Sequence, residues 1–252
     1  MEHEIVRDRF TGTAVLLTGA GSGIGRATAV RLVAEGAEVF AVDVSEDGLA
    51  ATVAAASGPG RILPHVADVS DEAAVVAAVS GAVAALEKLD ALVNVAGIHR
   101  TTPIGTLAVE DLRALFDVNV VGTALFCREA LRHLPAGGVI VNTASSSASH
   151  GNPYMTAYSA TKGAVLAFSL SLASEVIGRG IRVLVVSPGS TATPLTAGVQ
   201  FEGLDARYYS RIVSPMGTGR PEQIAATIAF AASRDASYLT GVDLRVDGGS
   251  HI

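Results

Sequence analysis

The chain has 252 residues, of which 49% are hydrophobic and 17% are charged, and its net charge is −6. This composition excludes an intrinsically disordered chain, because disorder goes with low hydrophobicity and high charge. The acidic balance argues against a protein that binds nucleic acid or an anionic membrane surface, since phosphate groups require a basic face. Dispersed alanine and valine raise the mean hydropathy, and we expect no run of about 20 apolar residues that could span a membrane.

Cysteine and histidine usage argue against disulfides and metal centres. The single cysteine, Cys127, permits no internal disulfide and no thiolate metal cluster. The six histidines are scattered without the short spacing of a zinc site, so no metal is predicted. The beginning of the chain lacks the basic-then-apolar order of a secretory signal. We therefore expect a reduced, cytoplasmic protein.

Short apolar runs alternate with alanine-rich stretches along the chain. The runs predict strands near 13–18, 37–43, 61–66, 90–95, 138–144, 181–187 and 242–246, and the stretches predict helices near 23–35, 46–56, 71–87, 109–134, 154–178 and 221–233. Several strands are apolar at consecutive positions, which indicates burial on both faces and a parallel sheet covered by helices on each side. No repeat or linker divides the sequence, so we predict one doubly wound α/β domain over 1–252.

The segment 190–219 departs from this alternation. It is rich in serine, threonine, glycine and proline, and it carries Phe201, Tyr208, Tyr209 and Met216. A connection of this length between a strand and a helix is commonly functional. We predict a substrate lid here, with a disordered surface loop as the alternative.

A glycine-rich turn follows the first predicted strand. The glycines of the segment 19–25 let the backbone turn tightly, and the helix that starts there offers free N–H groups to a pyrophosphate. We take as candidate phosphate-binding residues Gly19, Ser22, Gly23, Ile24 and Gly25.

Acidic residues follow the second and third predicted strands. Asp43 stands where a dinucleotide fold places an acceptor for the adenosine ribose hydroxyls, and its charge would repel a 2′-phosphate. Neither Ser22 nor Val44 offers a compensating cation, so we predict NAD rather than NADP. Asp68, followed by Val69, is a candidate for contact with the adenine. Each aspartate could instead cap the helix that follows it.

Tyr158 and Lys162 lie four residues apart on a predicted helix, which places both side chains on one face. A free tyrosine has a pKa near 10, so acting as a base near neutral pH requires a shift worth about 4 kcal/mol. An ammonium group about 5 Å away at a moderate dielectric contributes about 3 kcal/mol. Burial opposes this effect, and the positive ring of NAD⁺ could supply the remainder.

A serine cluster follows the strand predicted near 138–144. Ser145 precedes Tyr158 by thirteen residues, and a strand end followed by a helix start can bring the two together. Ser146, Ser147 and Ser149 compete for the same role, and spacing does not separate them.

The chain resembles the short-chain dehydrogenase/reductase family through a series of motifs in the family's order. They are Thr18-Gly19-x-x-x-Gly23-x-Gly25, Asn94-Val95-Ala96-Gly97, Asn119, Ser145, Tyr158-x-x-x-Lys162, Pro188-Gly189-x-x-x-Thr193 and the ending Val246-Asp247-Gly248-Gly249. The resemblance covers essentially the whole chain and implies a Rossmann-type sheet of seven strands. Val95 replaces the second asparagine of the commonest family form.

The resemblance also implies residue roles. Tyr158 would exchange a proton with the substrate oxygen, Ser145 would hydrogen-bond that oxygen, and Lys162 would bind the nicotinamide ribose and lower the tyrosine pKa. Asn119 would anchor a water molecule in a proton relay. The remaining cofactor contacts would come from Asn94 and Gly97 at the adenosine ribose, and from Pro188, Gly189, Thr191 and Thr193 at the nicotinamide side.

The resemblance places the substrate among segments near Gly97, 146–155 and the lid. These offer, besides Ser145 and Tyr158, the candidates Ser147, His99, Arg100, His150 and Met155. Their chemistry suits a small secondary alcohol or ketone. Arg100 could bind a carboxylate, as a dehydrogenase of the 2,3-dihydro-2,3-dihydroxybenzoate type would require. An NADPH-dependent 3-oxoacyl reductase is a further alternative, for which Asp43 is the discriminating residue. A non-catalytic NAD-binding scaffold is disfavoured, because its usual mark is degenerate catalytic positions and all four are intact here.

The helices predicted over 109–134 and 154–178 carry apolar residues on more than one face. Such helices need cover beyond their own sheet. We predict that both pack across a two-fold interface, and the family resemblance suggests a homotetramer, with a homodimer as the alternative.

Overall fold

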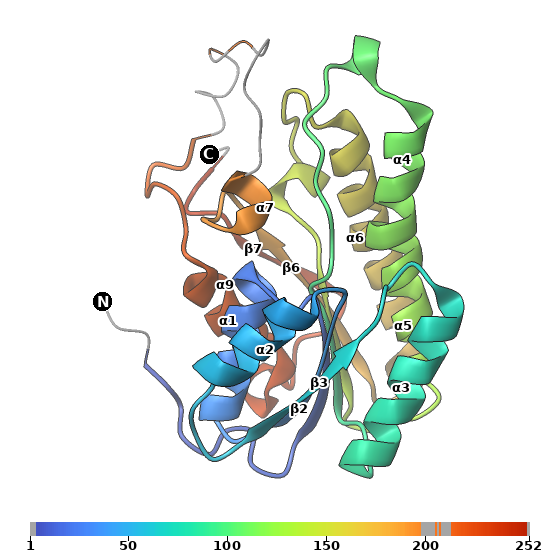
Figure 1. Cartoon of the computed structure of the whole chain (residues 1–252), viewed down its shortest axis with the longest axis vertical. Coiled ribbons are helices and arrows are strands. Elements are labelled where there is room, and N and C mark those ends of the chain that lie inside the picture. Colours follow the sequence, from blue (N-terminus) through green and yellow to red (C-terminus); the bar gives the residue numbers. More distant parts are fainter. Residues whose placement is uncertain (1–3, 198–204, 206, 208–212, 251–252) are drawn as a thin grey trace.

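The computed structural model describes residues 4–197, 205, 207 and 213–250. One parallel sheet runs through it in the order β3-β2-β1-β4-β5-β6-β7 (Figure 1). Its strands are β1 (Ala14–Thr18), β2 (Glu38–Asp43), β3 (Arg61–Val66), β4 (Ala91–Asn94), β5 (Val139–Thr143), β6 (Arg182–Pro188) and β7 (Val242–Val246). The predicted seven-stranded parallel sheet with helices on both sides is confirmed.

Helices cover both faces of the sheet. They are α1 (Gly23–Ala34), α2 (Glu46–Ala55), α3 (Glu72–Leu86), α4 (Val109–Phe116), α5 (Thr123–Ala130), α6 (Thr156–Val176), the short α7 (Pro194–Ala197) and α9 (Pro221–Ala232). Successive strand residues point to opposite faces. In β1, Leu16 therefore packs into the cluster formed with α3, α5 and α6, while Leu17 packs into the cluster formed with α1 and α9. The core is thus two apolar layers, one on each face.

The helix predicted over 109–134 runs without a break from Val109 to Ala130, but it is not α-helical throughout. Between α4 and α5 the backbone forms a π-helical segment, Asp117–Gly122, and α5 ends at Ala130. The wider turn places the side chain of Asn119 against the backbone of Ile98, which is far away in sequence. Helical periodicity alone does not reveal such a segment, because its cause is a long-range contact.

By length and composition, α6 together with the turn after it (Thr156–Arg179) could cross a membrane, contrary to the expectation from hydropathy. Its inner residues, among them Leu172 and Val176, belong to the core cluster that covers the sheet. Core helices of water-soluble proteins pass the same length test, and in this structure α6 occupies a core position.

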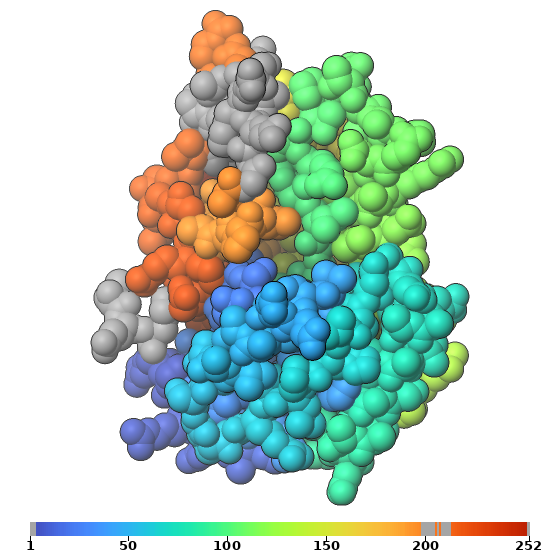
Figure 2. All heavy atoms as spheres, viewed as in Figure 1, coloured from blue at the N-terminus to red at the C-terminus, as the bar shows by residue number. Residues whose placement is uncertain are grey.

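The predicted lid lies partly outside the described residues, where Phe201, Tyr208 and Tyr209 fall. Its described part begins with α7, which Figure 2 shows at the surface in orange, above the blue N-terminal part of the chain. A bridge between Thr191 and Gly219 joins the two ends of the segment.

The order of the strands reverses between β1 and β4, because the chain moves outward from β1 to β3 and then returns to the other side. In open α/β sheets, ligands bind beyond the carboxyl ends of the strands at such a point. The glycine-rich turn after β1 and the segment after β4 therefore meet at the expected binding edge.

Candidate functional site

Two connected hollows lie at this edge. The first, here called the inner cavity, has a volume of about 90 Å³ and is lined by Ser145, Tyr158 and Lys162 together with residues after β6. The second, here called the long cleft, has a volume of about 540 Å³ and runs from the glycine-rich turn past the ends of β2 and β3. Both are lined by Ile24, Val95, Gly97, Ile98, Thr193 and Leu195. They therefore form one continuous site.

The glycine-rich turn is shaped by close backbone contacts. Gly19 has φ +73°, and a Cβ there would lie 2.6 Å from the backbone nitrogen of Ala96. A Cβ on Gly25 would overlap the carbonyl oxygen of Gly19. Ser22 stands at the N-cap of α1, but its side chain makes no capping bond. The first N–H groups of α1 are therefore free of a side-chain cap and can donate to a ligand in the cleft, as phosphate binding requires.

Asp43 lines the long cleft at the end of β2. Its two carboxylate oxygens accept hydrogen bonds from the backbone N–H groups of Gly21, at 2.8 Å, and Ser45, at 2.9 Å. Ser45 caps α2 by accepting from Gly48. Asp43 is therefore not the helix cap, and its carboxylate is held at the cleft wall.

Asp68 and Val69 also line the long cleft, after β3. The N-cap of α3 is Asp71, whose carboxylate accepts from Ala73 and Ala74. Asp68 is therefore not needed as that cap, and its carboxylate accepts from Ser70 instead. The helix-capping alternative is wrong for Asp43 and for Asp68 alike.

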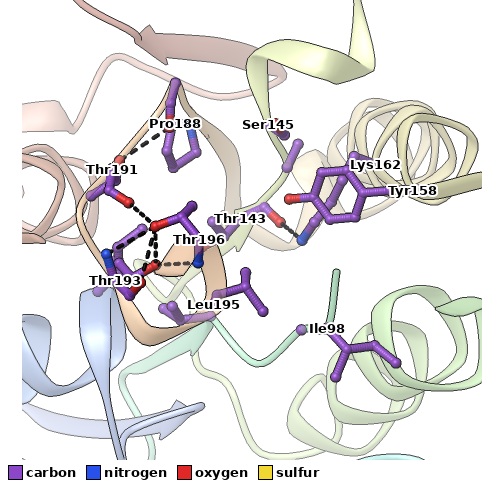
Figure 3. A pocket seen from close by; sticks show the side chains of 15 residues that line it. Ile98, Thr143, Ser145, Tyr158, Lys162, Pro188, Thr191, Thr193, Leu195 and Thr196 are labelled. Atoms are coloured by element: carbon purple, nitrogen blue, oxygen red, sulfur yellow. Dashed lines mark hydrogen bonds between the residues drawn. The ribbon is translucent and has the colours of Figure 1, made fainter. Parts of the chain in front are cut away.

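Figure 3 shows the hydroxyl of Tyr158 and the amine of Lys162 on the same side of the inner cavity, with Ser145 beside them. The Lys162 amine lies 5.9 Å from the centre of the Tyr158 ring. It donates a hydrogen bond of 2.9 Å to the backbone carbonyl of Thr143. The predicted tyrosine, lysine and serine thus meet at one place, where α6 faces the end of β5.

The predicted lowering of the tyrosine pKa is not found in the chain by itself. Burial raises the pKa of Tyr158 to about 12, and a hydrogen bond from Ser145 offsets only part of that effect. Burial also lowers the pKa of Lys162 to about 8. Desolvation therefore outweighs attraction between the two groups, and additional positive charge is needed before the phenol can act as a base near neutral pH.

Ser145 is oriented by Ser147, which was predicted to line the substrate site. Ser147 is buried, with 3% of its surface exposed, and both its hydroxyl and its backbone N–H donate to the Ser145 oxygen, at 2.9 and 3.2 Å. Its hydroxyl proton is committed to Ser145 and it is not among the residues that line the inner cavity, so its contact with substrate stays a prediction. Of the serines in the cluster, Ser145 is the one that lines the inner cavity, and Ser147 orients it there.

Asn119 is fully buried and holds three partners with its side chain. Its amide oxygen accepts from the N–H of Ile98 at 2.8 Å, and its amide nitrogen donates to the carbonyl of Ile98 and to the Thr161 hydroxyl, each at 3.0 Å. The side chain has no donor left for a water molecule. A relay water at this residue would have to bind the backbone carbonyl, which also accepts from Thr123.

Asn94 lines neither the inner cavity nor the long cleft. Its side chain is buried and donates to Asn142 at 2.9 Å, and Asn142 donates in turn to Ser169 on α6 at 2.9 Å. Cys127, which is completely buried, contacts both asparagines. The Asn94 side chain is therefore committed to this network between β4, β5 and α6, and the ribose contact predicted for Asn94 stays a prediction.

Four other predicted substrate residues are not among those that line the inner cavity. Arg100 is exposed and pairs with Asp111 at 3.4 Å. His150 bonds with the carbonyl of Ser146 and with Arg245. Met155 is the residue before α6, and its sulfur accepts from Asn152. His99 does not line that cavity either, but its ring packs against the ring of Tyr158, which does.

Several lining residues are absent from the predicted set. The carbonyl of Thr143 fixes Lys162, and the side chains of Ile98, Leu195 and Thr196 line the inner cavity. Thr143 could have been expected from its place at the strand end just before Ser145. The residues that were predicted after β6, namely Pro188, Gly189, Thr191 and Thr193, do line this cavity.

The site fits a nicotinamide dinucleotide. The uncapped start of α1 faces the middle of the long cleft, Asp43 stands at one end, and the Ser145–Tyr158–Lys162 group lies at the other. Gly97 leaves room at that second end, since a Cβ there would come within 3.4 Å of the Lys162 amine.

Known proteins resemble this chain over nearly its whole length. A family model described as enoyl-(acyl carrier protein) reductase matches residues 19–251. The 3-oxoacyl-[acyl-carrier-protein] reductase FabG of Thermotoga maritima is 37% identical, with 96% of this chain and 98% of that protein covered.

Solved structures agree with the sequence relatives. The crystal structure of levodione reductase superposes with a TM-score of 0.89 at 36% identity, covering 95% of this chain and 98% of the other. A short chain dehydrogenase from Burkholderia cenocepacia, in complex with NADP, gives 0.88 at 34% identity and covers 97% and 100%. Levodione reductase is an enzyme of Leifsonia aquatica.

Proposed function

Because this chain belongs to the short-chain dehydrogenase/reductase family, we propose that it transfers a hydride between NAD(H) and a small secondary alcohol or ketone. The observation that carries the proposal is the meeting of Ser145, Tyr158 and Lys162 in a cavity that opens into the long cleft. The nicotinamide would supply or accept the hydride when it is bound. The inner cavity is small and lined by several apolar side chains, which supports a compact substrate.

The residues of this chain divide the remaining chemistry. Tyr158 exchanges a proton with the substrate oxygen, and Ser145, with its own oxygen accepting from Ser147, donates a hydrogen bond to that oxygen. Lys162, fixed by the Thr143 carbonyl, stands within reach of ribose hydroxyls beside Gly97. Its charge, together with that of an oxidised nicotinamide ring, opposes the burial that keeps the Tyr158 pKa high.

Asp43 supports NAD over NADP. Its carboxylate is held at the cleft wall and would accept the ribose hydroxyls but repel a 2′-phosphate. Arg26 is the basic residue beside the glycine-rich turn, and it does not line the long cleft. Its guanidinium donates to the carbonyls of Gly21 and Gly48 and to the Thr52 hydroxyl. It is therefore committed behind the turn rather than offered to a phosphate.

The test measures kcat/KM with NAD⁺ and with NADP⁺ on a panel of small secondary alcohols and polyols. We expect turnover with a preference in kcat/KM for NAD⁺ of about 100-fold. With NADP⁺ the half-buried Asp43 carboxylate would lose a ribose hydrogen bond and face a like charge, which together cost about 3 kcal/mol. Asp43→Ser should bring the kcat/KM values for NAD⁺ and NADP⁺ closer together.

Tyr158→Phe should lower kcat about 10³-fold, the usual scale of acid–base catalysis, while NADH still binds. Binding of NADH without turnover by the wild type would indicate a non-catalytic scaffold.

An NADPH-dependent 3-oxoacyl reductase is the second candidate, because the relative from Thermotoga maritima carries that name. Preference for NADP⁺ together with reduction of 3-oxoacyl thioesters would select it over our proposal. The dihydrodiol alternative has lost its main support, because Arg100 pairs with Asp111 outside the inner cavity.

A further inference from the structure

His99 is an unexplained imidazole next to the reacting group. Its ring centre lies 4.6 Å from that of Tyr158, and the two planes meet at 76°, which is an edge contact. The residue before it, Ile98, is held at both its N–H and its carbonyl by Asn119. The backbone that carries His99 is therefore anchored, and the imidazole is half-buried beside the phenol.

Within the part of the chain that the structure describes, His99 makes no hydrogen bond to another residue. Neither ring nitrogen is among the buried polar atoms that lack a hydrogen-bond partner. Both nitrogens are therefore exposed enough to bond with a ligand. His150 differs, because its nitrogens are bonded to Ser146 and Arg245. Of these two predicted pocket histidines, His99 is thus the one whose hydrogen-bonding groups the described fold leaves unused.

Burial, and secondarily the charge of Arg100, lowers the pKa of His99 below its usual value. The imidazole is therefore neutral near pH 7, with one nitrogen that donates and one that accepts. That pair matches a hydroxyl group, which can also donate and accept. A carboxylate would be better served by a cation, and the nearby Arg100 is bound to Asp111.

We propose that His99 is a specificity-determining residue that hydrogen-bonds a second substrate oxygen on the carbon next to the reacting carbinol. Tyr158 and Ser145 line the inner cavity and would hold the reacting oxygen. The His99 imidazole is not part of that lining, but it touches the Tyr158 ring, so the second oxygen that it bonds must lie close to the first. Apolar Ile98 and Leu195 line the inner cavity as well. The favoured substrates are then small vicinal diols and α-hydroxy ketones.

This inference rests on the proposed function. In the oxidation of a vicinal diol, the C–H hydride goes to NAD⁺ and the hydroxyl proton goes to the Tyr158 phenolate, which leaves a hydroxy ketone. The second hydroxyl keeps its proton and remains bonded to His99.

The experiment compares kcat/KM for butane-2,3-diol with kcat/KM for butan-2-ol, which lacks the second oxygen. The wild type should favour the diol. His99→Phe keeps an aromatic edge against Tyr158 but removes both nitrogens, and it should lower the diol-to-alcohol ratio about fivefold to tenfold, the value of one hydrogen bond. His99→Asn restores a donor and an acceptor and should recover part of the ratio. Circular dichroism melts establish that both variants are folded.

Two outcomes overturn the inference while leaving the proposed function intact. One is turnover by the wild type without preference for the diol. The other is an equal loss of both activities in His99→Phe, which would show that the imidazole only supports the Tyr158 ring. If the wild type oxidises no secondary alcohol and reduces no ketone with either cofactor, the proposed function fails, and this inference fails with it.

Discussion

The oxygen of Ser145 accepts two hydrogen bonds from one neighbour, the backbone N–H and the hydroxyl of Ser147. With its lone pairs so engaged, the Ser145 hydroxyl has its own proton to give, and that proton is directed at the phenol of Tyr158. Under the proposed function, Ser147 is therefore a positioning residue, which would act on the substrate through Ser145.

Ser147→Ala should lower kcat about 3-fold to 10-fold with little change in KM, because one hydrogen bond that orients a donor is lost. Ser145→Ala should have the larger effect. The double variant should resemble Ser145→Ala, since residues that share one network are not additive. Steady-state kinetics decide this, with Ser174→Ala on the outer surface of α6 as the control. Additive effects of the two changes would contradict the arrangement.

Lys162 is a buried cation, and burying its charge lowers the stability of the folded chain. It is 4% exposed, and burial lowers its pKa from 10.5 to about 8, which corresponds to roughly 3 kcal/mol against the charged form. Removing an uncompensated buried charge commonly stabilises a protein even where it destroys function. The proposed function accounts for a buried cation here, because Lys162 would bind the nicotinamide ribose.

Lys162→Met should therefore raise Tm at pH 7 by a few degrees while abolishing turnover. Because the folded-state pKa is depressed, the wild type gains stability as the pH rises from about 8 to 10.5, where only the unfolded chain still binds the proton. The difference in Tm between Lys162→Met and the wild type should therefore become smaller between about pH 8 and 10.5. Thermal melts at pH 7 and at pH 10 measure it, and a variant less stable than the wild type at pH 7 would refute the assignment.

At the scale of elements, the π-helical segment joins three parts of the site. Asn119 lies on it, holds the segment after β4 through Ile98, and reaches α6 through the hydroxyl of Thr161. Thr161 also donates to the backbone carbonyl of Tyr158. Single π-helical turns are frequent at functional sites, and here the turn aligns the strand end with the catalytic helix.

Thr161→Val should destabilise the chain by about 1–2 kcal/mol, because it leaves a buried N–H of Asn119 without a partner. Thr161→Ser keeps the hydroxyl and should behave nearly as the wild type. Urea unfolding of both variants measures the difference. Equal stabilities of the valine and serine variants would show that the contact between Asn119 and Thr161 contributes nothing.

Elements and most strand-end residues could be predicted from the sequence, because local patterns cause them. Short apolar runs that alternate with alanine-rich stretches predict the sheet and its helices. Because the strands are parallel, their ends bring Asp43, Ser145 and Thr191 to one edge. Hydroxyl and amide partners could not be predicted in this way. Ser147 bonding to Ser145, and Asn94 bonding to Asn142, depend on side-chain directions in three dimensions that spacing does not contain. The prediction of a lowered pKa for Tyr158 was wrong for a related reason. The pKa is raised by burial, and burial depends on the packing around the side chain.

At the scale of the whole molecule, α4, α5 and α6 lie together on one side (Figure 1). Several large apolar side chains there are exposed: Val109 at 48%, Val121 at 42% and Leu170 at 39%. Other apolar residues of the same helices, such as Leu115 and Phe126, belong to the core. The division supports the predicted two-fold interface across these helices, because apolar groups left at the surface favour contact with a second copy.

Light scattering at micromolar concentration should therefore give a particle of two or four chains. Val121→Asp combined with Leu170→Asp should reduce its mass, since two charges would be buried at the contact. Glu175→Gln, elsewhere on α6, should leave the mass unchanged. A wild-type particle of about 25 kDa would contradict the interface.

Cys127 gives the chain a built-in reporter of its own opening. The thiol is completely sealed between the two asparagines that bridge β4 and β5, and burial raises its pKa to about 12. Alkylating reagents need an accessible thiolate, so the folded chain should resist them, and modification should follow the rate at which the sheet parts from α5. Since no second cysteine competes for the reagent, the labelling rate gives the protection of the innermost strands directly.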